Sequence, residues 1–406
     1  MTAGTPVNDP LLAWRPEFPV LERCHYLVSH SLGAMPRGVR DSLAAYADSW
    51  DRHGVRAWNE SWWTLGREVA DSIAPLLNAP SGSLVLQQNA SIANSILFSA
   101  LDFSDPRRNR VVISDMDFPS DSFALRQWTP PGVEICMLRS PDGIGLDIDE
   151  LLAAIDERTR LVSLSHVLFR SGCILPARDI VSRAQEVGAQ VLLNGYHSVG
   201  VIPVDVAALE VDFYVGGTLK WLCGGPGGVF LYVRPDLLAG LQPKVSGWLA
   251  LQQPFAFDSE HFPLREDIGR LQNGTPGIAS LHAIRPGINI VRKVGVAAIR
   301  EKSRRQTALL VDLARRAGHA LGSPAEAERR AGTVTVMPAH AWEVSRELLA
   351  RDYVIDYREG AGIRIAPHFY SSDGEVRGVM QAVDDILADG SWRRHSAQGP
   401  DHGSAT

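Results

Sequence analysis

The segment TLKWLCGGPGGVFLYV sets one lysine, Lys220, just before a glycine-rich turn. The turn contains Gly224, Gly225, Gly227 and Gly228. A lysine in a shielded cleft loses its proton readily, and its neutral amine can then attack an aldehyde. Glycines beside it allow the backbone to approach a bound group closely. Taken alone, the stretch favours a surface lysine at a loop edge, so the residues around it have to decide.

Two polar residues follow a short apolar run upstream, in LLNGYHSVGVIPVDVAALEVDFY. Asn194 and His197 come at the carboxyl end of this run. Because ligands bind beyond the carboxyl ends of parallel strands, we expect both side chains to face the cleft that contains Lys220. Taken as chemistry alone, His197 is equally typical of a buried histidine with satisfied hydrogen bonds.

Short β-branched runs separated by helical segments have to position these residues. We predict strands at 111–114, 161–166, 191–194, 212–216 and 229–233, and helices at 37–50, 65–78 and 178–188. This alternation predicts an α/β fold with a mainly parallel sheet flanked by helices.

The pattern changes beyond about Gly277. A long helical stretch over 279–319 precedes TVTVMP, another helix and YVIDYREGAGIRIAPH, which predicts a smaller α+β C-terminal domain. With 406 residues, two domains are the natural expectation. We therefore predict an N-terminal arm over 1–35, a large domain over 36–276, a small domain over 277–392 and a disordered tail over 393–406.

Composition excludes several classes of protein. Hydrophobic residues make up 45% and charged residues 21%, which is ordinary for a globular chain. The net charge of -6 gives no electrostatic reason to expect nucleic acid as a partner. The four cysteines lack metal-type spacing and are typical of reduced thiols, so we expect no metal. Neither a signal peptide nor a membrane span is recognisable, so we expect a cytoplasmic protein without a membrane partner.

The run from Asn194 through Gly228 resembles the cofactor segment of the class V aminotransferases, in which an acidic residue and a His or Gln three positions later precede the lysine. Within that group, further motifs resemble those of kynureninases. HYLVSHSLGAMPRGV resembles their Asn-Ser-Leu-Gly motif and DFPSDSF their Phe-Pro-Ser-Asp motif; SWDRHGVRAW, SHVLFRSG and GIRIAPHFY also have counterparts. The matches run in order from about residue 25 to 372 and are specific when taken together.

The resemblance implies that pyridoxal 5'-phosphate (PLP) is the cofactor, bound by the large domain of a fold type I enzyme. Lys220 would hold it as a Schiff base and then move protons at the substrate Cα. Phe118 would stack on the pyridine ring, and Ser91 with Ile92 would bind the phosphate at a helix N-terminus. The remaining implied cofactor contacts are Asp121, Asn194, His197, Thr218 and Thr275. Most of these residues also have a structural interpretation, as a core ring, an N-cap, a turn residue or a loop hydroxyl.

Three residues are implied at the substrate. Arg364 in GIRIAP matches the arginine that binds the substrate carboxylate, for which a planar guanidinium fork is well suited. Trp248 in SGWLA would line the pocket, although many tryptophans simply pack. Asn273 and Thr275 in LQNGTPG resemble a segment that reaches across a dimer interface, although a plain Gly-Pro turn is an alternative. The resemblance thus implies a homodimer with a small amino-acid substrate.

Position 194 departs from the family pattern, which has an aspartate there. An adjacent carboxylate keeps the pyridine nitrogen protonated, and the protonated ring is the stronger electron sink. Asn194 supplies no charge and can only hydrogen-bond. Three interpretations stay open: a reaction that needs less carbanion stabilisation, an impaired or repurposed enzyme, or a residue exchanged by engineering.

Leu219 is a second departure. Kynureninases have a tyrosine directly before the lysine, thought to assist proton transfer during cleavage of the acyl group. Leucine neither donates nor accepts a proton. The change bears on kynurenine hydrolysis more than on PLP binding.

The leading hypothesis is a kynureninase-like PLP enzyme that acts at Cα and Cβ of an L-amino acid, by β-cleavage or elimination. Hydrolysis of an aryl-carbonyl substrate to give alanine is the family version. A class V aminotransferase or epimerase uses the same lysine and stays open, as does a PLP-binding relative with lost or altered turnover. A cysteine desulfurase is rejected, because no cysteine follows Cys223 in the chain.

Overall fold

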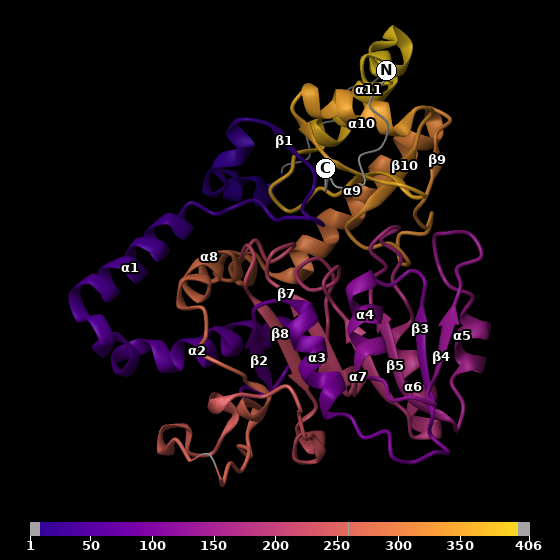
Figure 1. The fold of residues 1–406 in the computed structure, drawn as a ribbon. Coiled ribbons are helices and arrows are strands. Elements are labelled where there is room, and N and C mark those ends of the chain that lie inside the picture. The colour runs from indigo at the N-terminus through magenta and orange to yellow at the C-terminus, as the bar shows by residue number, and fades with distance from the viewer. Residues whose placement is uncertain (1–8, 259, 397–406) are drawn as a thin grey trace.

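A seven-stranded sheet forms the centre of the larger domain, in the order β2-β8-β7-β6-β5-β3-β4 (Figure 1). The computed structural model describes residues 9–258 and 260–396. The strands from β4 to β7 pair in parallel, whereas β8 is antiparallel to both β7 and β2. The strands are β2 (Leu84–Gln87), β3 (Arg110–Ser114), β4 (Glu134–Leu138), β5 (Thr159–Ser165), β6 (Gln190–Asn194), β7 (Phe213–Gly217) and β8 (Val229–Val233). The prediction of a mainly parallel sheet is confirmed.

Helices cover both faces of this sheet, which explains why its strands are apolar without alternation. Successive side chains of a strand point to opposite faces. Leu192 on one face packs in a cluster with residues of α3 and α4, whereas Leu193 on the other packs with residues of α2, α6 and α8. The helices of this domain are α1 (Gly38–His53), α2 (Trp63–Ile73), α3 (Ala90–Ala100), α4 (Pro119–Trp128), α5 (Ile148–Ala154), α6 (Ala177–Val187) and α7 (Val206–Leu209).

The sequence pattern did not predict β2 and β4. Strand β4 lies at the edge of the sheet, and most side chains of its segment EICML are only partly buried, although residues 135–138 are all apolar. Strand β2 is short and lies at the opposite edge. Edge strands have fewer packing partners than central ones, and their sequences are accordingly less distinctive.

The smaller domain is built on a four-stranded sheet in the order β12-β13-β10-β9, whose pairs are all antiparallel. Its core joins Val334 and Ile363 on the sheet to Leu310 and Val379 on the helices. The elements are α9 (Val296–Arg316), β9 (Ala320–Leu321), β10 (Val334–Met337), α10 (Ala341–Ala350), β12 (Asp356–Arg358), β13 (Gly362–Ile365) and α11 (Asp373–Asp389). The expected smaller α+β domain is therefore present.

The long helical stretch expected over 279–319 is two helices. Gly295, with a φ of 84°, separates α8 (Ile278–Val294) from α9, because this backbone conformation suits glycine and interrupts a helix. Helix α8 packs against α1 and α2 of the larger domain (Figure 1). Helix α8, which begins just after the expected boundary at 277, thus packs with helices of the larger domain.

The N-terminal arm joins the smaller domain to the segment that carries Lys220. Strand β1 (His25–Tyr26) pairs in parallel with β11 (Tyr353–Val354). A few residues later, the Gly33 N–H donates a hydrogen bond of 2.8 Å to the Leu219 carbonyl. Residues 1–8 of the expected arm lie outside the described residues.

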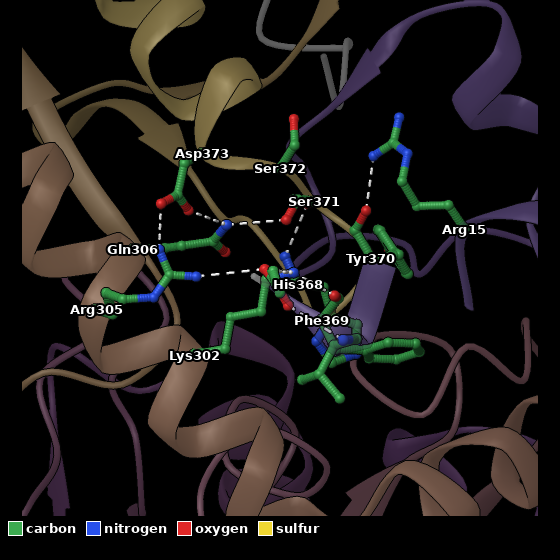
Figure 2. Close-up of polar contacts among 12 residues, drawn as sticks. Arg15, Lys302, Arg305, Gln306, His368, Phe369, Tyr370, Ser371, Ser372 and Asp373 are labelled. Atoms are coloured by element: carbon green, nitrogen blue, oxygen red, sulfur yellow. Dashed lines mark hydrogen bonds and ion pairs between the residues drawn. The ribbon is translucent and has the colours of Figure 1, made fainter. Parts of the chain in front are cut away.

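The segment after β13 is held by polar contacts from two sides, which Figure 2 shows. From α9, Lys302 Nζ donates to the Phe369 carbonyl at 2.6 Å and Gln306 Nε2 to the Ser371 carbonyl at 2.9 Å. From the N-terminal arm, Arg15 Nη1 donates to the Tyr370 carbonyl at 2.6 Å. These three carbonyls lie outside the strands, so the side-chain hydrogen bonds supply the partners that a sheet does not. The bonds also fix the segment after β13 relative to the N-terminal arm.

Part of the expected tail is ordered. Residues Ser391–His395 form a short helical segment, and His395 Nε2 lies 3.1 Å from the Glu347 carboxylate. Residues 397–406 lie outside the described residues. In the part of the chain that is described, no helix is long and apolar enough to cross a membrane.

Candidate active site

Lys220 lies just beyond the carboxyl end of β7, and its amine contacts His197. The distance from Lys220 Nζ to His197 Nε2 is 2.6 Å. Burial, reinforced by the charge of Arg364, lowers the pKa of Lys220 to about 7. Burial, and then the charge of Lys220, lowers the pKa of His197 well below its usual value. A substantial fraction of the lysine is therefore a neutral amine near pH 7, which the chemistry expected of Lys220 requires.

Two aromatic rings lie around this amine. Lys220 Nζ is 5.3 Å from the centre of the Tyr196 ring and 6.0 Å from that of Phe118. The Phe118 ring packs edge-on against Phe169 at 5.4 Å, and 49% of Phe118 is exposed. An exposed ring face beside the amine is available to a planar ligand.

A buried carboxyl group lies between two asparagines. Asn194 Nδ2 donates to Asp121 Oδ2 at 2.6 Å, and Asn94 Nδ2 donates to Asp121 Oδ1 at 2.7 Å. Burial, with a further contribution from Asp117, raises the pKa of Asp121 to about 7, although the bond from Asn194 opposes the change. Asn194 Oδ1 accepts from the Tyr196 N–H at 3.0 Å, so the asparagine is fixed at both ends.

Helix α3 opens towards the same region. Asn89 caps it by accepting from the Ile92 N–H at 3.0 Å, so this N–H is already bonded. The Ser91 N–H belongs to the first turn, where no intrahelical acceptor exists. Ser91 is exposed, as an anion-binding helix N-terminus requires. Asn94 then links α3 to Asp121 of α4.

The glycine turn after Lys220 is held by Thr218 and approached by Gly33. Thr218 is fully buried and its hydroxyl donates to the Gly228 carbonyl at 3.0 Å and the Gly225 carbonyl at 3.1 Å. The Thr218 hydroxyl thus stabilises the turn. A Cβ at Gly33 would overlap the Lys220 carbonyl and lie 2.8 Å from Cys223 Cα, so only glycine fits this close approach.

Arg364 is buried in an ion pair with Asp356, opposite it in the β12–β13 hairpin. Its Nε and Nη2 donate to the two Asp356 oxygens at 2.8 and 2.6 Å. Nη1 donates to the Phe169 carbonyl at 2.6 Å, and Nη2 also contacts Ser31 Oγ at 3.3 Å. A guanidinium has five N–H donors, and these four bonds leave one on Nη1. Asp356 therefore already occupies the paired N–H groups of Arg364 that were expected to bind the substrate carboxylate.

Asn273 lines a cavity of about 340 Å³ together with Trp63 and Phe255, and the Trp248 ring packs edge-on against the rings of Trp63 and Phe255. The Leu249 N–H donates to the Asn273 carbonyl at 3.4 Å, which joins the two segments. Thr275 is exposed. Within the described residues, no hydrogen bond or ring contact connects these three positions to Lys220. The chain therefore brings Lys220, His197, Phe118, Asp121 and Asn194 together. Asn273 lines a cavity that also includes Gly227 of the glycine turn.

The grouped residues fit the chemical parts of PLP. The amine of Lys220 suits an aldehyde, and the exposed face of Phe118 suits a pyridine ring. Asp121 suits a ring nitrogen, and the open end of α3 suits a phosphate. Asn94 Oδ1 is buried without a hydrogen-bond partner among the described residues, which leaves a polar acceptor in the same region.

Sequence reasoning missed Asn94, Asp356 and His30. Asp356 had a usable signal, because residues 356 and 364 are equidistant from Gly360 in a hairpin whose turn reads REGAG. His30 lies in the quoted motif SHSLG, but its surroundings come from distant strands. Asn94 had no distinguishing signal, since it stands in an ordinary helix.

Comparisons with known proteins point to one family. A family model described as aminotransferase class-V matches residues 25–367. The chain is similar to the kynureninase of Bacillus thuringiensis subsp. konkukian (strain 97-27), with 30% identity over 95% of this chain and 94% of that protein. It is also similar to the kynureninase of Pseudomonas fluorescens, with 29% identity and 96% of each chain covered.

Solved structures share the fold at lower identity. A cysteine desulfurase from Thermococcus onnurineus NA1 has a TM-score of 0.84 at 19% identity, over 96% of this chain and 100% of that one. A variant of C-DES with glycine covalently linked to its PLP cofactor has a TM-score of 0.83 at 19% identity, over 91% of this chain and 99% of that one.

Proposed function

Because this chain belongs to the class V aminotransferase family as a kynureninase-like, PLP-dependent member, we propose that it cleaves or eliminates a β-substituent of an L-amino acid. Within that proposal, hydrolysis of an aryl-carbonyl amino acid to alanine is the specific reaction. A substrate of the kynurenine type has the required carbonyl group next to Cβ.

The observation that carries the proposal is the contact between Lys220 and His197. An amine whose pKa is lowered to about 7 by burial can exist in neutral and protonated forms at physiological pH. A general acid or base works best when its pKa lies near the working pH. His197, 2.6 Å away, is placed to exchange a proton with this amine.

The residues around Lys220 supply the remaining functions. PLP, when bound, withdraws electrons from the substrate Cα. Lys220 takes the proton from Cα and returns one later, while Phe118 supports a planar ring with its exposed face. Asp121 offers a carboxyl group at the end of the sheet. One N–H on Nη1 of Arg364 makes no hydrogen bond within the described residues. This N–H can donate one hydrogen bond to the substrate carboxylate, so a further donor has to complete the binding of the carboxylate.

Two alternatives use the same lysine. A class V aminotransferase or an epimerase also needs Lys220 to move a proton at Cα. Asn194 and Leu219 favour a PLP-binding relative without turnover. Asn194 replaces the expected aspartate, and Leu219 replaces the expected tyrosine with its hydroxyl. The retained contact between Lys220 and His197 supports a catalytic protein instead.

The products formed from an amino-acid substrate distinguish β-cleavage from transamination, epimerisation and loss of turnover. The purified protein is loaded with PLP, reduced with borohydride and digested, and we expect the cofactor on the peptide that contains Lys220. Unreduced enzyme is then incubated with L-kynurenine, and we expect release of alanine. Lys220→Ala is expected to abolish both results, whereas Lys244→Ala at an exposed position is the matched control.

Other outcomes reassign the reaction. Formation of a keto acid from the amino acid would favour an aminotransferase, and exchange of the Cα proton without cleavage would favour an epimerase. Cofactor on Lys220 with no product of any kind would favour a non-catalytic relative. If borohydride fixes no cofactor on Lys220, the proposal is wrong in its central claim.

A homodimer is part of the proposal. Phe255 and Phe257 are 57% and 78% exposed and continue a chain of ring contacts from Trp63 and Trp248. Their segment lies below α2 in Figure 1. Exposed apolar patches of this kind often mark protein interfaces. Light scattering after gel filtration tests this: we expect the mass of a dimer, and a shift towards monomer in the variant Phe255→Ser, Phe257→Ser.

A further inference from the structure

His368 is a buried histidine that holds the backbone carbonyl directly after the cofactor lysine. It is 2% exposed, and its Nε2 lies 2.9 Å from the Trp221 carbonyl. A carbonyl oxygen only accepts, so Nε2 carries the ring proton and donates the hydrogen bond. Nδ1 is then a bare acceptor, and it is buried without a hydrogen-bond partner in the described part of the chain. The proposed function assigns no task to this residue.

The backbone of the lysine segment, residues 219–223, is fixed by several close contacts. The carbonyls of its first three residues accept in turn from the Gly33 N–H at 2.8 Å, the Cys223 N–H at 3.0 Å and His368 Nε2 at 2.9 Å. A Cβ at Gly287 of α8 would overlap the Cys223 carbonyl, so only glycine allows this approach of the helix. Among the described residues, His368 is the only side chain from outside the segment that hydrogen-bonds to its backbone.

His368 belongs to the segment that also follows from Arg364. It comes four residues after Arg364, just beyond β13. Figure 2 shows that the next carbonyl, of Phe369, accepts from Lys302 of α9 at 2.6 Å. The His368 ring also packs edge-on against Trp221, with 5.2 Å between ring centres. His368 therefore links the segment after Arg364 to the segment of the lysine.

We propose that His368 is a positioning residue that fixes Lys220 relative to Arg364 through the Trp221 carbonyl. The inference rests on the roles of Lys220 and Arg364 proposed above. Lys220 takes the proton from Cα, and Arg364 donates to the carboxylate on the same carbon. The two groups come from different domains and have to meet at one atom of the substrate. A misplacement of about 1 Å can cost on the order of a hundredfold in rate.

This role requires a donor that keeps its proton. Burial lowers the pKa of His368 to about 3 and the charge of Lys302 adds to this effect, although the bond to Trp221 opposes it. The ring is therefore neutral at physiological pH, with its proton on Nε2. An apolar side chain would fill the same space without burying the unpaired acceptor Nδ1, which costs stability. The imidazole thus points to the N–H at Nε2 as the group that matters.

The experiment reports the surroundings of the Lys220 amine without using turnover. Cofactor-free protein is mixed with PLP at a series of pH values, and samples are reduced with borohydride at intervals to measure the PLP fixed to Lys220. The rate rises with the neutral fraction of the amine and gives its apparent pKa. Burial is the main reason why the pKa of Lys220 is about 7. Displacement of the segment and entry of water therefore raise this pKa towards its ordinary value.

Two amide variants separate the two ring nitrogens of His368. The amide of asparagine corresponds in position to Nδ1, and that of glutamine to Nε2. His368→Asn loses the donor to Trp221, and we expect the apparent pKa of Lys220 to rise by about one unit, which makes attachment about tenfold slower below that pKa. His368→Gln keeps an N–H for the Trp221 carbonyl, and we expect a profile close to that of the wild type. His319→Asn, at a histidine that pairs with Asp384 at 2.8 Å in the smaller domain, is the control and should leave the profile unchanged.

The outcomes separate this inference from the function on which it rests. Circular dichroism checks folding, and His368→Leu replaces His368→Asn if the asparagine variant does not fold. If Lys220 is labelled in every variant with the same apparent pKa, His368 has no positioning role. Equal shifts in His368→Asn and His368→Gln would assign the effect to packing of the ring and overturn the role of the Nε2 bond. If the wild-type protein is not labelled at Lys220, the proposed function itself fails.

Discussion

The side-chain amide of Asn194 donates a hydrogen bond of 2.6 Å to the carboxyl group of Asp121. The acidic group that position 194 lacks is therefore present on the neighbouring helix, in direct contact with the asparagine. Asn94 donates to the other oxygen of the same group at 2.7 Å. One carboxyl group held by two amides thus stands at the carboxyl end of β6, and the site keeps an acid despite Asn194.

Asp121 is expected to make the stability of the cofactor-free protein depend on pH. Its folded pKa of about 7 lies above the ordinary value near 4, so folding favours the protonated form. This stability is fully present below about pH 4 and is lost as the pH rises through 7. We expect Asp121→Asn to flatten the decline in the free energy of unfolding between about pH 5 and pH 8. Urea unfolding at several pH values measures this, with exposed Asp149→Asn as the control; an unchanged slope would contradict it.

A second carboxyl group at position 194 should compete with the first. Asn194→Asp removes an amide donor and places two carboxyl groups within about 3 Å, where both are not ionised together at neutral pH. We expect a loss of about 1–3 kcal/mol in the free energy of unfolding at pH 8 and a smaller loss at pH 5. The double variant Asp121→Asn, Asn194→Asp again has one carboxyl group and should recover most of the loss. Equal losses in the single and double variants would show that the two residues do not interact.

We expect Asp356 to be essential for the stability of the protein, because it neutralises the buried Arg364. Asp356→Ala leaves a guanidinium that is 2% exposed without its carboxylate, and we expect a loss of about 3–5 kcal/mol in the free energy of unfolding. Although burial alone would raise it, His30 and Arg364 hold the pKa of Asp356 well below its usual range. Its contribution is therefore present above about pH 4 and falls as the pH drops.

The control for Asp356 is an exposed pair of the same type. Arg234 Nε contacts Asp236 at 2.7 Å, with the Asp236 side chain 63% exposed. We expect Asp236→Ala to change the free energy of unfolding by less than about 1 kcal/mol, since water screens such pairs. If both variants lose the same amount, burial of the Asp356 pair has no special role. Urea unfolding at pH 7 measures both.

Gly33 is expected to control the backbone of the cofactor lysine. In Gly33→Ala the new methyl group meets the Lys220 carbonyl and the Cys223 Cα, so the lysine segment has to move. We expect a loss of about 1–3 kcal/mol in stability, together with less borohydride-fixed PLP on Lys220. Gly38→Ala is the matched control, because its Cβ meets Pro286 at an ordinary 3.6 Å. Normal PLP attachment in Gly33→Ala would contradict the prediction.

Much of the fold was predictable from local patterns. The strands at 191–194 and 229–233 lie where their apolar runs indicated, because side chains buried on both faces of a central strand have to be apolar. The order of the motifs indicated the family, and the polar residues after β6 and β7 do meet. Edge strands β2 and β4, and the break at Gly295, were not predicted, since single edge runs and single glycines have many possible meanings.

The sequence by itself determined which residues could do chemistry: the lysine beside its glycine turn, the histidine that meets it and the motifs of a PLP enzyme. Only the tertiary structure decided how they combine. It set Asp121 against Asn194, turned the fork of Arg364 towards Asp356, and buried His30 behind His197. The physical reason is range. Local patterns follow from burial of neighbouring residues, whereas charge and protonation depend on side chains that only folding brings within a few ångströms.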